Sequence, residues 1–246
     1  ESCNNPWGYK FTWNPKNVVL AGKDGARYLK NGEIKEISYD EVFKTTENVF
    51  IPNFGNFESY PNRDSLHYKE KYKLDEVQTL VRGTMRKKDF ASAWDFLVNI
   101  GFTSFDQSRE IITKDIYLDK VKMIKDKKIL EMLNYLGLFD LKFKNSKSNG
   151  QILQNILEKK WKLQTQDKDM IVMQHKFEFE KENIKERLYS SMAIIGSDSI
   201  RTAMAKTVGL PIFFAAKLIL EGKVSLRGVR IPVHKELYVP ILKNLE

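Results

Sequence analysis

The sequence predicts an α+β fold: a mixed, largely antiparallel sheet packed by helices, with an inserted all-helical subdomain. Segments typical of strands come first, then helices, then strands and helices again, without the regular alternation of a doubly wound sheet. Asn31-Gly32 lies between two alternating runs, which is the strongest short-range signal of a hairpin. The middle of the chain repeats apolar residues every three or four positions. We therefore expect residues 1–86 and 167–246 to form one α+β domain, with 87–166 as a helical insertion.

Aromatic residues alternate with polar ones near the start of the chain, which predicts an extended segment with one buried face: Trp7, Tyr9, Phe11 and Trp13. Such a cluster needs a neighbour to pack against. We expect the sequence to be a fragment whose missing N-terminal part supplies that neighbour. Asn14 followed by Pro15 then predicts the start of a short helix.

The remaining elements follow from local pattern. Further strands are expected in "NVFIPNF", "FESYPNR" and "VQTLVRGTM", and amphipathic helices in "DFASAWDFLVNIGF", "KDKKILEMLNYLGLFD" and "NGQILQNILEKKWKL". "DMIVMQHKFEFE" and "IKERLYSSMAIIG" predict an antiparallel pair that turns near Glu182-Asn183. "SIRTAMAKTVGLPIFFAAKLILEG" predicts a long helix, continuous or interrupted near Gly209-Pro211, and "KELYVPILKNLE" a last helix.

The chain is basic, with 41 Lys+Arg against 32 Asp+Glu in 246 residues, a formal net charge of +9. Nucleic acid, an anionic small substrate and a solvated lysine-rich surface each explain such an excess. Much of it lies in "YLDKVKMIKDKKILEML", where helical spacing of the apolar residues places the lysines on an outer face. The aromatic residues lie in apolar periodic runs and do not interleave with Lys and Arg, which disfavours nucleic acid.

Several classes of site have no sequence signature here. The single cysteine, Cys3, excludes an internal disulfide and a multi-cysteine metal site. No dinucleotide-binding turn, phosphate-binding loop or HExxH motif occurs, so we expect no metal site. The longest apolar stretch, "GLPIFFAAKLILEG", contains Lys217 and reads as too short to span a bilayer. With no signal-like leader, these features predict a cytoplasmic protein.

Two segments set arginines in turns: "SYPNRDS" and "TLVRGTMRKKD". Arg63 follows Pro-Asn, while Arg82 and Arg86 flank Gly-Thr-Met. Turns fixed by Pro and Gly aim guanidinium groups at a defined point, which suits an anion with several carboxylates. The alternative for Arg63 is an internal ion pair with Asp64 or Asp75. Arg82, inside a strand run, is more typical of a structural arginine than Arg86.

The sequence also resembles a known family. The motifs "NPWGYKFTW", "YPNRDS", "RGTMR", "DMIVMQHKF", and "TAMAKTVGLP" followed by "AAKLILEGK" occur in this order in the saccharopine dehydrogenase (saccharopine reductase) family. The chain resembles the part of such an enzyme that follows its Rossmann domain. The resemblance implies an oxidoreductase that uses NADP or NAD in lysine metabolism. It interconverts saccharopine with glutamate and α-aminoadipate semialdehyde, by hydride transfer to an imine.

The resemblance also assigns roles to residues. It places substrate binding on Arg63, Thr84, Met85 and Arg86. It places the nicotinamide side of the cleft on Lys10, Phe11, Thr12 and Trp13. Catalytic residues are expected upstream of this chain, and the family implies a homodimer without nucleic-acid or membrane partners. Three alternatives remain: a reductase of another carboxylate-bearing imine such as a polyamine precursor, a basic nucleic-acid-binding module, and a catalytically idle dimerisation remnant.

Overall fold

The computed structural model describes residues 4–140 and 146–245, so Cys3 lies outside the described part. The chain divides into two compact units, Glu1–Lys69 with Asp75–Leu163, and Glu70–Leu74 with Gln164–Glu246. The domain division expected from the sequence remains a prediction for the complete protein. Within this chain, the helices between residues 87 and 163 share one hydrophobic core with the N-terminal segments.

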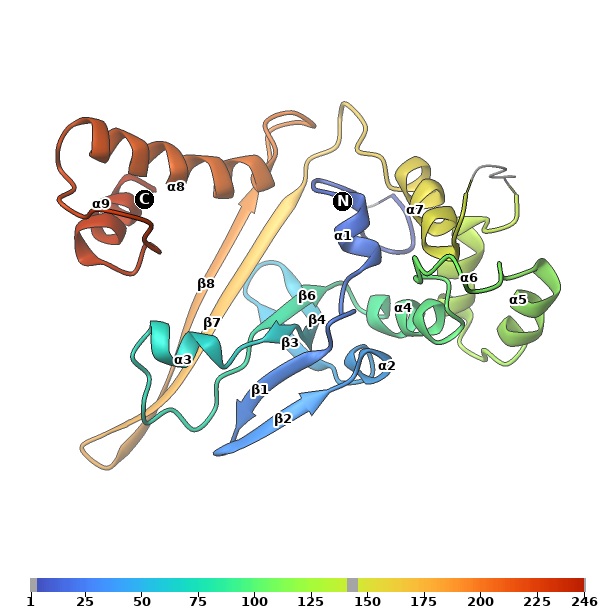
Figure 1. Cartoon of the computed structure of the whole chain (residues 1–246), viewed down its shortest axis with the longest axis horizontal. Helices are drawn as coiled ribbons and strands as arrows, with labels where there is room; N and C mark the ends of the chain where they lie inside the picture. Colours follow the sequence, from blue (N-terminus) through green and yellow to red (C-terminus); the bar gives the residue numbers. More distant parts are fainter. Residues whose placement is uncertain (1–3, 141–145, 246) are drawn as a thin grey trace. The chain divides into compact units, whose positions relative to one another are not determined.

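The first unit contains two small sheets of three strands each (Figure 1). Their orders are β2-β1-β5 and β3-β4-β6. The strands are β1 (Ala26–Lys30), β2 (Glu33–Ile37), β3 (Glu47–Ile51), β4 (Gly55–Pro61), β5 (Arg63–Asp64) and β6 (Gly83–Arg86). Every pairing is antiparallel except that of β1 with β5. The α+β class and the largely antiparallel pairing are confirmed, with several small sheets.

The turn between β1 and β2 has the expected chemistry. Asn31 and Gly32 have φ angles of 53° and 80°, which a two-residue hairpin turn of type I′ requires. The strand expected in "VQTLVRGTM" is shorter than predicted. Leu80 forms an isolated bridge with Leu29 of β1, whereas β6 begins at Gly83 in the other sheet. The run crosses between two sheets and therefore cannot form one strand.

The helices up to Leu163 are short: α1 (Pro15–Val19), α2 (Tyr39–Val42), α3 (His67–Lys71), α4 (Phe90–Asn99), α5 (Lys114–Val121), α6 (Lys127–Leu136) and α7 (Asn149–Lys160). Asn14 caps α1 as predicted, because its side-chain oxygen accepts a hydrogen bond from the Lys16 N–H. The lysine-rich stretch forms two helices, since Asp126 caps a new one. Its lysines are exposed, which confirms the solvated outer face.

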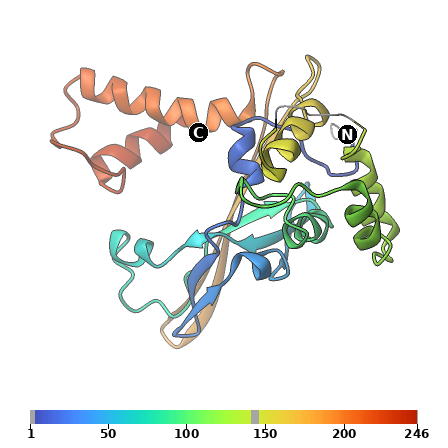
Figure 2. The same ribbon diagram turned by 45° about the vertical axis from the view of Figure 1, so that its right-hand side comes forward.

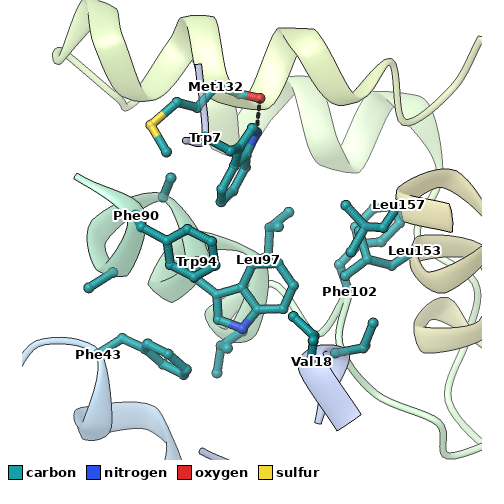
Figure 3. Packing of buried hydrophobic residues seen from close by; sticks show 14 of the residues in the cluster. Trp7, Val18, Phe43, Phe90, Trp94, Leu97, Phe102, Met132, Leu153 and Leu157 are labelled. Atoms are coloured by element: carbon teal, nitrogen blue, oxygen red, sulfur yellow. Dashed lines mark hydrogen bonds between the residues drawn. The ribbon is translucent and has the colours of Figure 1, made fainter. Parts of the chain in front are cut away.

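The core of this unit is built around Trp7, which is 1% exposed (Figure 3). Its indole N–H donates a 2.6 Å hydrogen bond to the Met132 carbonyl. Its ring meets Phe90, Trp94 and Trp161 edge-on, at centroid distances of 5.4, 6.0 and 5.4 Å. The expectation that a missing segment supplies the aromatic neighbours was therefore wrong, because Phe90 and Trp94 of α4 and Trp161, at the end of α7, supply them.

The second unit contains a long hairpin, β7 (Met170–Lys181) and β8 (Ile184–Ile195), and two helices, α8 (Ala203–Leu220) and α9 (Lys235–Leu245). The predicted turn is confirmed, since Glu182 and Asn183 have φ angles of 52° and 63°. Helices α8 and α9 lie side by side in both views (Figures 1 and 2). Leu218, Val224 and Ile241 form a small core between them.

Helix α8 runs unbroken through Gly209 and Pro211. It has 18 residues, a mean hydropathy of 1.6 and only 6% of its residues buried. By length and composition alone it is long enough to cross a membrane. The apolar stretch was judged too short because it was counted from Gly209, whereas the helix begins at Ala203. Core helices of soluble proteins meet the same criteria of length and composition, although they are mostly buried.

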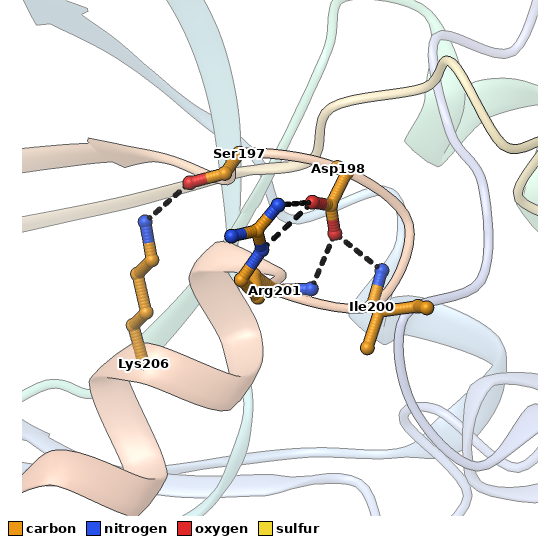
Figure 4. A network of polar contacts seen from close by, with 5 residues as sticks. All are labelled: Ser197, Asp198, Ile200, Arg201 and Lys206. Carbon is orange, nitrogen blue, oxygen red and sulfur yellow. Dashed lines mark hydrogen bonds and ion pairs between the residues drawn. The ribbon is translucent and has the colours of Figure 1, made fainter.

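A polar network fixes the loop that precedes α8 (Figure 4). The Asp198 carboxylate accepts hydrogen bonds from the backbone N–H groups of Ile200 and Arg201, and from the Arg201 guanidinium at 2.6 and 2.8 Å. Lys206 donates to the Ser197 hydroxyl at 2.9 Å. The loop is thereby held at the first turn of the helix.

Candidate anion-binding site

The two arginine motifs meet where the chain crosses between the two small sheets. Pro61, at the end of β4, pairs with Gly83, at the start of β6. The Asn62 N–H donates a 3.0 Å hydrogen bond to the Arg82 carbonyl. The Asn62 side-chain amide donates to the Thr84 hydroxyl at 2.8 Å. Two turns that are far apart in sequence are thus joined into one surface.

Close packing at this junction explains the glycine. A Cβ atom at Gly83 would overlap the Ser59 hydroxyl and crowd the Tyr60 carbonyl, so a side chain here would require Ser59 or the strand to shift. On the side of β5, the junction is fixed by Ser65, which is 1% exposed. Its hydroxyl accepts a 3.0 Å hydrogen bond from the Arg82 N–H, and its own N–H donates to the Arg27 carbonyl at 2.7 Å.

Arg63 is exposed and its backbone is strained. Its φ angle is 61°, in the left-handed region that non-glycine residues rarely adopt. Strain of this kind gathers at functional sites, where the surrounding structure holds it in place. The internal ion pair that was the alternative for Arg63 is not formed: Asp64 pairs with Arg27 at 3.5 Å. Within residues 4–140 and 146–245 the Arg63 side chain has no hydrogen-bond or ion-pair partner.

Arg86 lies half-buried against two aromatic rings. Its guanidinium carbon is 4.9 Å from the centroid of the Tyr9 ring and 5.5 Å from that of Phe90. Nη1 donates a 2.9 Å hydrogen bond to the Met85 carbonyl, whereas Nε is buried without a partner. Glu58 lies directly opposite on β4, but its carboxylate accepts a hydrogen bond from the Asp89 N–H. Among the described residues no carboxylate forms an ion pair with Arg86.

The positive charge of Arg86 acts on two neighbouring tyrosines. Burial raises the pKa of the Tyr9 and Tyr60 hydroxyls, and the guanidinium opposes that rise in both. Thr84 lies opposite Tyr60 and shares a face of β6 with Arg86, since side chains alternate along a strand. Met85 therefore points to the other face of β6.

The two arginines lie at different positions along the direction of β4. Arg86 pairs with Glu58, and Arg63 comes five positions later along the same chain direction. At strand spacing this amounts to a Cα separation of up to about 16 Å. A separation of this order suits an elongated ligand with carboxylates near both ends, and the shared point that the turns suggested stays a prediction.

The segment proposed for the cofactor, residues 10–13, directly follows Tyr9, whose ring contacts Arg86. The Phe11 N–H donates a 2.8 Å hydrogen bond to the Trp161 carbonyl, and the Phe11 ring packs on the Trp161 ring at 5.4 Å. Lys10 and Thr12 are half-buried, and the Trp13 side chain is 51% exposed. The buried face of this segment thus ends at Phe11. In the described part of the chain no group of His, Cys, Asp and Glu side chains is arranged to hold a metal ion.

Sequence reasoning missed three residues of this site. Asn62 lies within the "YPNRDS" turn, and its amide is the signal that could have found it, since Asn side chains commonly bond across turns. Tyr9 and Phe90 carried no such signal, because aromatic residues in apolar patterns read as core. Arg82 was expected to be structural, and its Nη1 lies 3.5 Å from the Tyr68 hydroxyl.

Comparison with known proteins assigns the chain to a class. The family model described as "Saccharopine dehydrogenase C-terminal domain" matches residues 1–246, and the chain belongs to that family. Among curated relatives, the "Saccharopine dehydrogenase [NADP(+), L-glutamate-forming]" of Pyricularia oryzae is 34% identical over 279 residues. The match covers 100% of this chain and 61% of that protein.

Two further relatives agree with this assignment. The mitochondrial "Alpha-aminoadipic semialdehyde synthase" of Bos taurus is 32% identical over 274 residues, which cover 100% of this chain and 30% of that protein. The solved apo saccharopine dehydrogenase (L-Glu forming) of Saccharomyces cerevisiae has a TM-score of 0.87 and 31% identity, over 99% of this chain and 61% of its own. The chain thus spans less than two thirds of the length of these proteins.

Proposed function

We propose that this chain is the part of an NADP-dependent saccharopine dehydrogenase that binds the substrate carboxylates. The complete enzyme interconverts saccharopine with glutamate and α-aminoadipate semialdehyde, in lysine metabolism. The observation that carries the proposal is the junction of the two arginine turns: Asn62 joins them, and each presents a guanidinium without an acidic partner among the described residues.

The ligand fits this arrangement by charge and length. Saccharopine has three carboxylates spread along an extended molecule, so its site has to neutralise several negative charges at separate positions. Arg63 would bind one end and Arg86 the other, with the Thr84 hydroxyl beside Arg86. Arginine suits this role better than lysine, because its planar fork pairs with a carboxylate through two parallel hydrogen bonds.

NADP(H) would supply the hydride that reduces the imine carbon. The residues of this chain that fit beside the nicotinamide are Thr12 and Trp13, because a hydroxyl and a half-exposed ring remain accessible there. Phe11 already packs on Trp161, and its N–H is bonded to the Trp161 carbonyl, so its part is to fix the segment. The phosphates and the catalytic acid or base would be held elsewhere in the complete enzyme.

We further propose a homodimer formed through the second unit. Its strands and helices expose large apolar side chains. Those 44–65% exposed include Phe177, Phe179, Leu188, Ile212 and Phe213. Exposed apolar patches of this kind mark protein interfaces. Light scattering of the 246-residue chain should report twice its mass, and a monodisperse monomer would contradict the dimer. We also propose a cytoplasmic location, since a chain with a single cysteine forms no internal disulfide.

Steady-state kinetics of the complete enzyme test the function. We expect turnover of saccharopine with NADP, and of glutamate plus α-aminoadipate semialdehyde with NADPH. The matched comparison is the imine of a polyamine precursor, the substrate of the related reductase. Faster turnover of that imine than of saccharopine would contradict the proposal, as would tight, salt-sensitive binding of nucleic acid by the chain.

A further inference from the structure

We infer that Tyr9 is a positioning residue for the substrate: its ring, together with that of Phe90, holds the Arg86 guanidinium in the orientation that meets a substrate carboxylate. The inference rests on the proposed function. It adds Tyr9 as a residue that acts on the substrate through Arg86, without a contact between its own hydroxyl and the ligand. It arises from the way in which the guanidinium is held against two aromatic rings.

The rings of Tyr9 and Phe90 form a notch around Arg86. Their centroids are 5.8 Å apart and their planes are inclined at 64°. The guanidinium carbon lies within 6 Å of both centroids, at 4.9 and 5.5 Å, the range in which the π-face of a ring attracts a cation. Because Nη1 is bonded to the Met85 carbonyl, the plane of the guanidinium is fixed on several sides.

This leaves Nη2 as the terminal nitrogen without a protein partner in the described part of the chain. An acid paired with Nη2 would compete with a ligand, and in the described part of the chain the opposing Glu58 forms no ion pair with Arg86; one of its carboxylate oxygens accepts a hydrogen bond from the Asp89 N–H. Aromatic faces can hold a cation in place without neutralising it. The notch therefore fixes the guanidinium and preserves its charge for a carboxylate.

Tyr9 is the ring that can be tested. Phe90 is 2% exposed and stacks on Trp94 in the core, so its replacement would disturb the whole unit. Tyr9 is only half-buried and is steadied by Trp161, at a centroid distance of 5.2 Å. It also immediately precedes the segment beside the cofactor, so it links the two parts of the site.

The experiment compares Tyr9→Leu, which keeps apolar volume without a π-face, with Tyr9→Phe, which keeps the ring. Phe57→Leu is the matched control, because Lys87 lies 4.3 Å above the Phe57 ring in a similar cation–π contact. In the complete enzyme, Tyr9→Leu should raise the KM for saccharopine about 3- to 10-fold. We expect Tyr9→Phe and Phe57→Leu to stay within about twofold of wild type, and the KM for NADP to stay so in all three.

A spectroscopic measurement separates positioning from stability. In the 246-residue chain the Nε–Hε resonance of Arg86, identified by its loss in Arg86→Lys, should be shifted upfield by the two rings. Tyr9→Phe should keep that shift and Tyr9→Leu should lose most of it. If Tyr9→Leu does not fold, the position of the Arg86 Hε resonance in the wild-type chain is the test. A wild-type Hε resonance without an upfield shift would overturn the inference.

The KM of Arg86→Ala, measured in parallel, distinguishes a failure of the Tyr9 inference from a failure of the proposed function. If Arg86→Ala raises the KM for saccharopine while Tyr9→Leu leaves it within twofold, Tyr9 is not a positioning residue and the proposed function stands. If Arg86→Ala also leaves the KM unchanged, both fail. A lowered melting temperature in Tyr9→Leu without a change in KM or in the Hε shift would assign Tyr9 to the core alone.

Discussion

The side-chain amide of Asn62 donates a 2.8 Å hydrogen bond to the hydroxyl of Thr84, and this bond joins the two turns that carry the candidate site. Both turns lie where the chain leaves one small sheet and enters the other. Neither sheet alone would place Arg63 beside the strand of Arg86. The geometry of the site therefore depends on the junction and not on either turn by itself.

Removing the Asn62 amide should weaken this junction. We expect Asn62→Ala to lower the free energy of unfolding by about 0.5–1.5 kcal/mol, the net worth of a neutral hydrogen bond. It should also raise the KM for saccharopine in the complete enzyme. Asn56→Ala, at an exposed position of β4, is the control. Chemical denaturation of the 246-residue chain measures the stability, and equal values for both variants would show that the bond contributes nothing.

A side chain at position 83 should destabilise the fold because it would overlap Ser59. Gly83→Ala places a methyl group on the Ser59 hydroxyl, and overpacking of this kind costs about 1–3 kcal/mol. Adding Ser59→Gly removes that overlap and should recover part of the loss. The melting temperatures of the two single variants and the double variant give the coupling. Strict additivity would mean that the close approach of β4 and β6 is not what requires glycine.

The stability of the first unit should depend strongly on Trp7. Trp7→Ala removes a buried ring and its hydrogen bond to Met132, and we expect a loss of about 3–5 kcal/mol. Trp13→Ala is the matched control, since Trp13 is 51% exposed and its loss should change stability little. Urea denaturation monitored by tryptophan fluorescence compares them. Similar losses in both variants would contradict the packing of Trp7 described above.

The loop before α8 should weaken in acid. Hydrogen bonds from the backbone N–H and the side chain of Arg201 lower the pKa of Asp198 from 3.8 to about 2. The carboxylate therefore stabilises the folded state above pH 3.8, and this contribution is lost as the pH falls through about 2. We expect the melting temperature of Asp198→Ala to lie below that of wild type by a constant amount above about pH 5. The difference should shrink between pH 4 and 2, and a difference independent of pH would contradict the assignment.

The sequence predicted elements whose signals are local. Asn31-Gly32 marked one hairpin and Glu182-Asn183 the other, because few residues adopt left-handed backbone angles. The partners of Trp7 could not be predicted, since they lie more than eighty residues away on three helices and aromatic patterning does not specify distant contacts.

For the candidate site, too, the sequence indicated the local turns but not how they are arranged in space. Pro and Gly in the two turns indicated an anion site, and the structure joins those turns. Their separation along β4 and β6, the left-handed backbone of Arg63 and the notch around Arg86 depend on strand register and tertiary packing. No local pattern reports register between strands that are distant in sequence.

The most direct test of the account is the KM for saccharopine in complete enzymes carrying Arg63→Ala or Arg86→Ala. Each change leaves a substrate carboxylate without its charged partner, which costs about 1.5–3 kcal/mol. That corresponds to a loss of about 10- to 200-fold in kcat/KM. Arg63→Lys and Arg86→Lys should recover only part of it, because an ammonium group cannot pair bidentately. If kcat and KM of both alanine variants stay within about twofold of wild type while their melting temperatures fall, the arginines are structural and the proposed site is wrong.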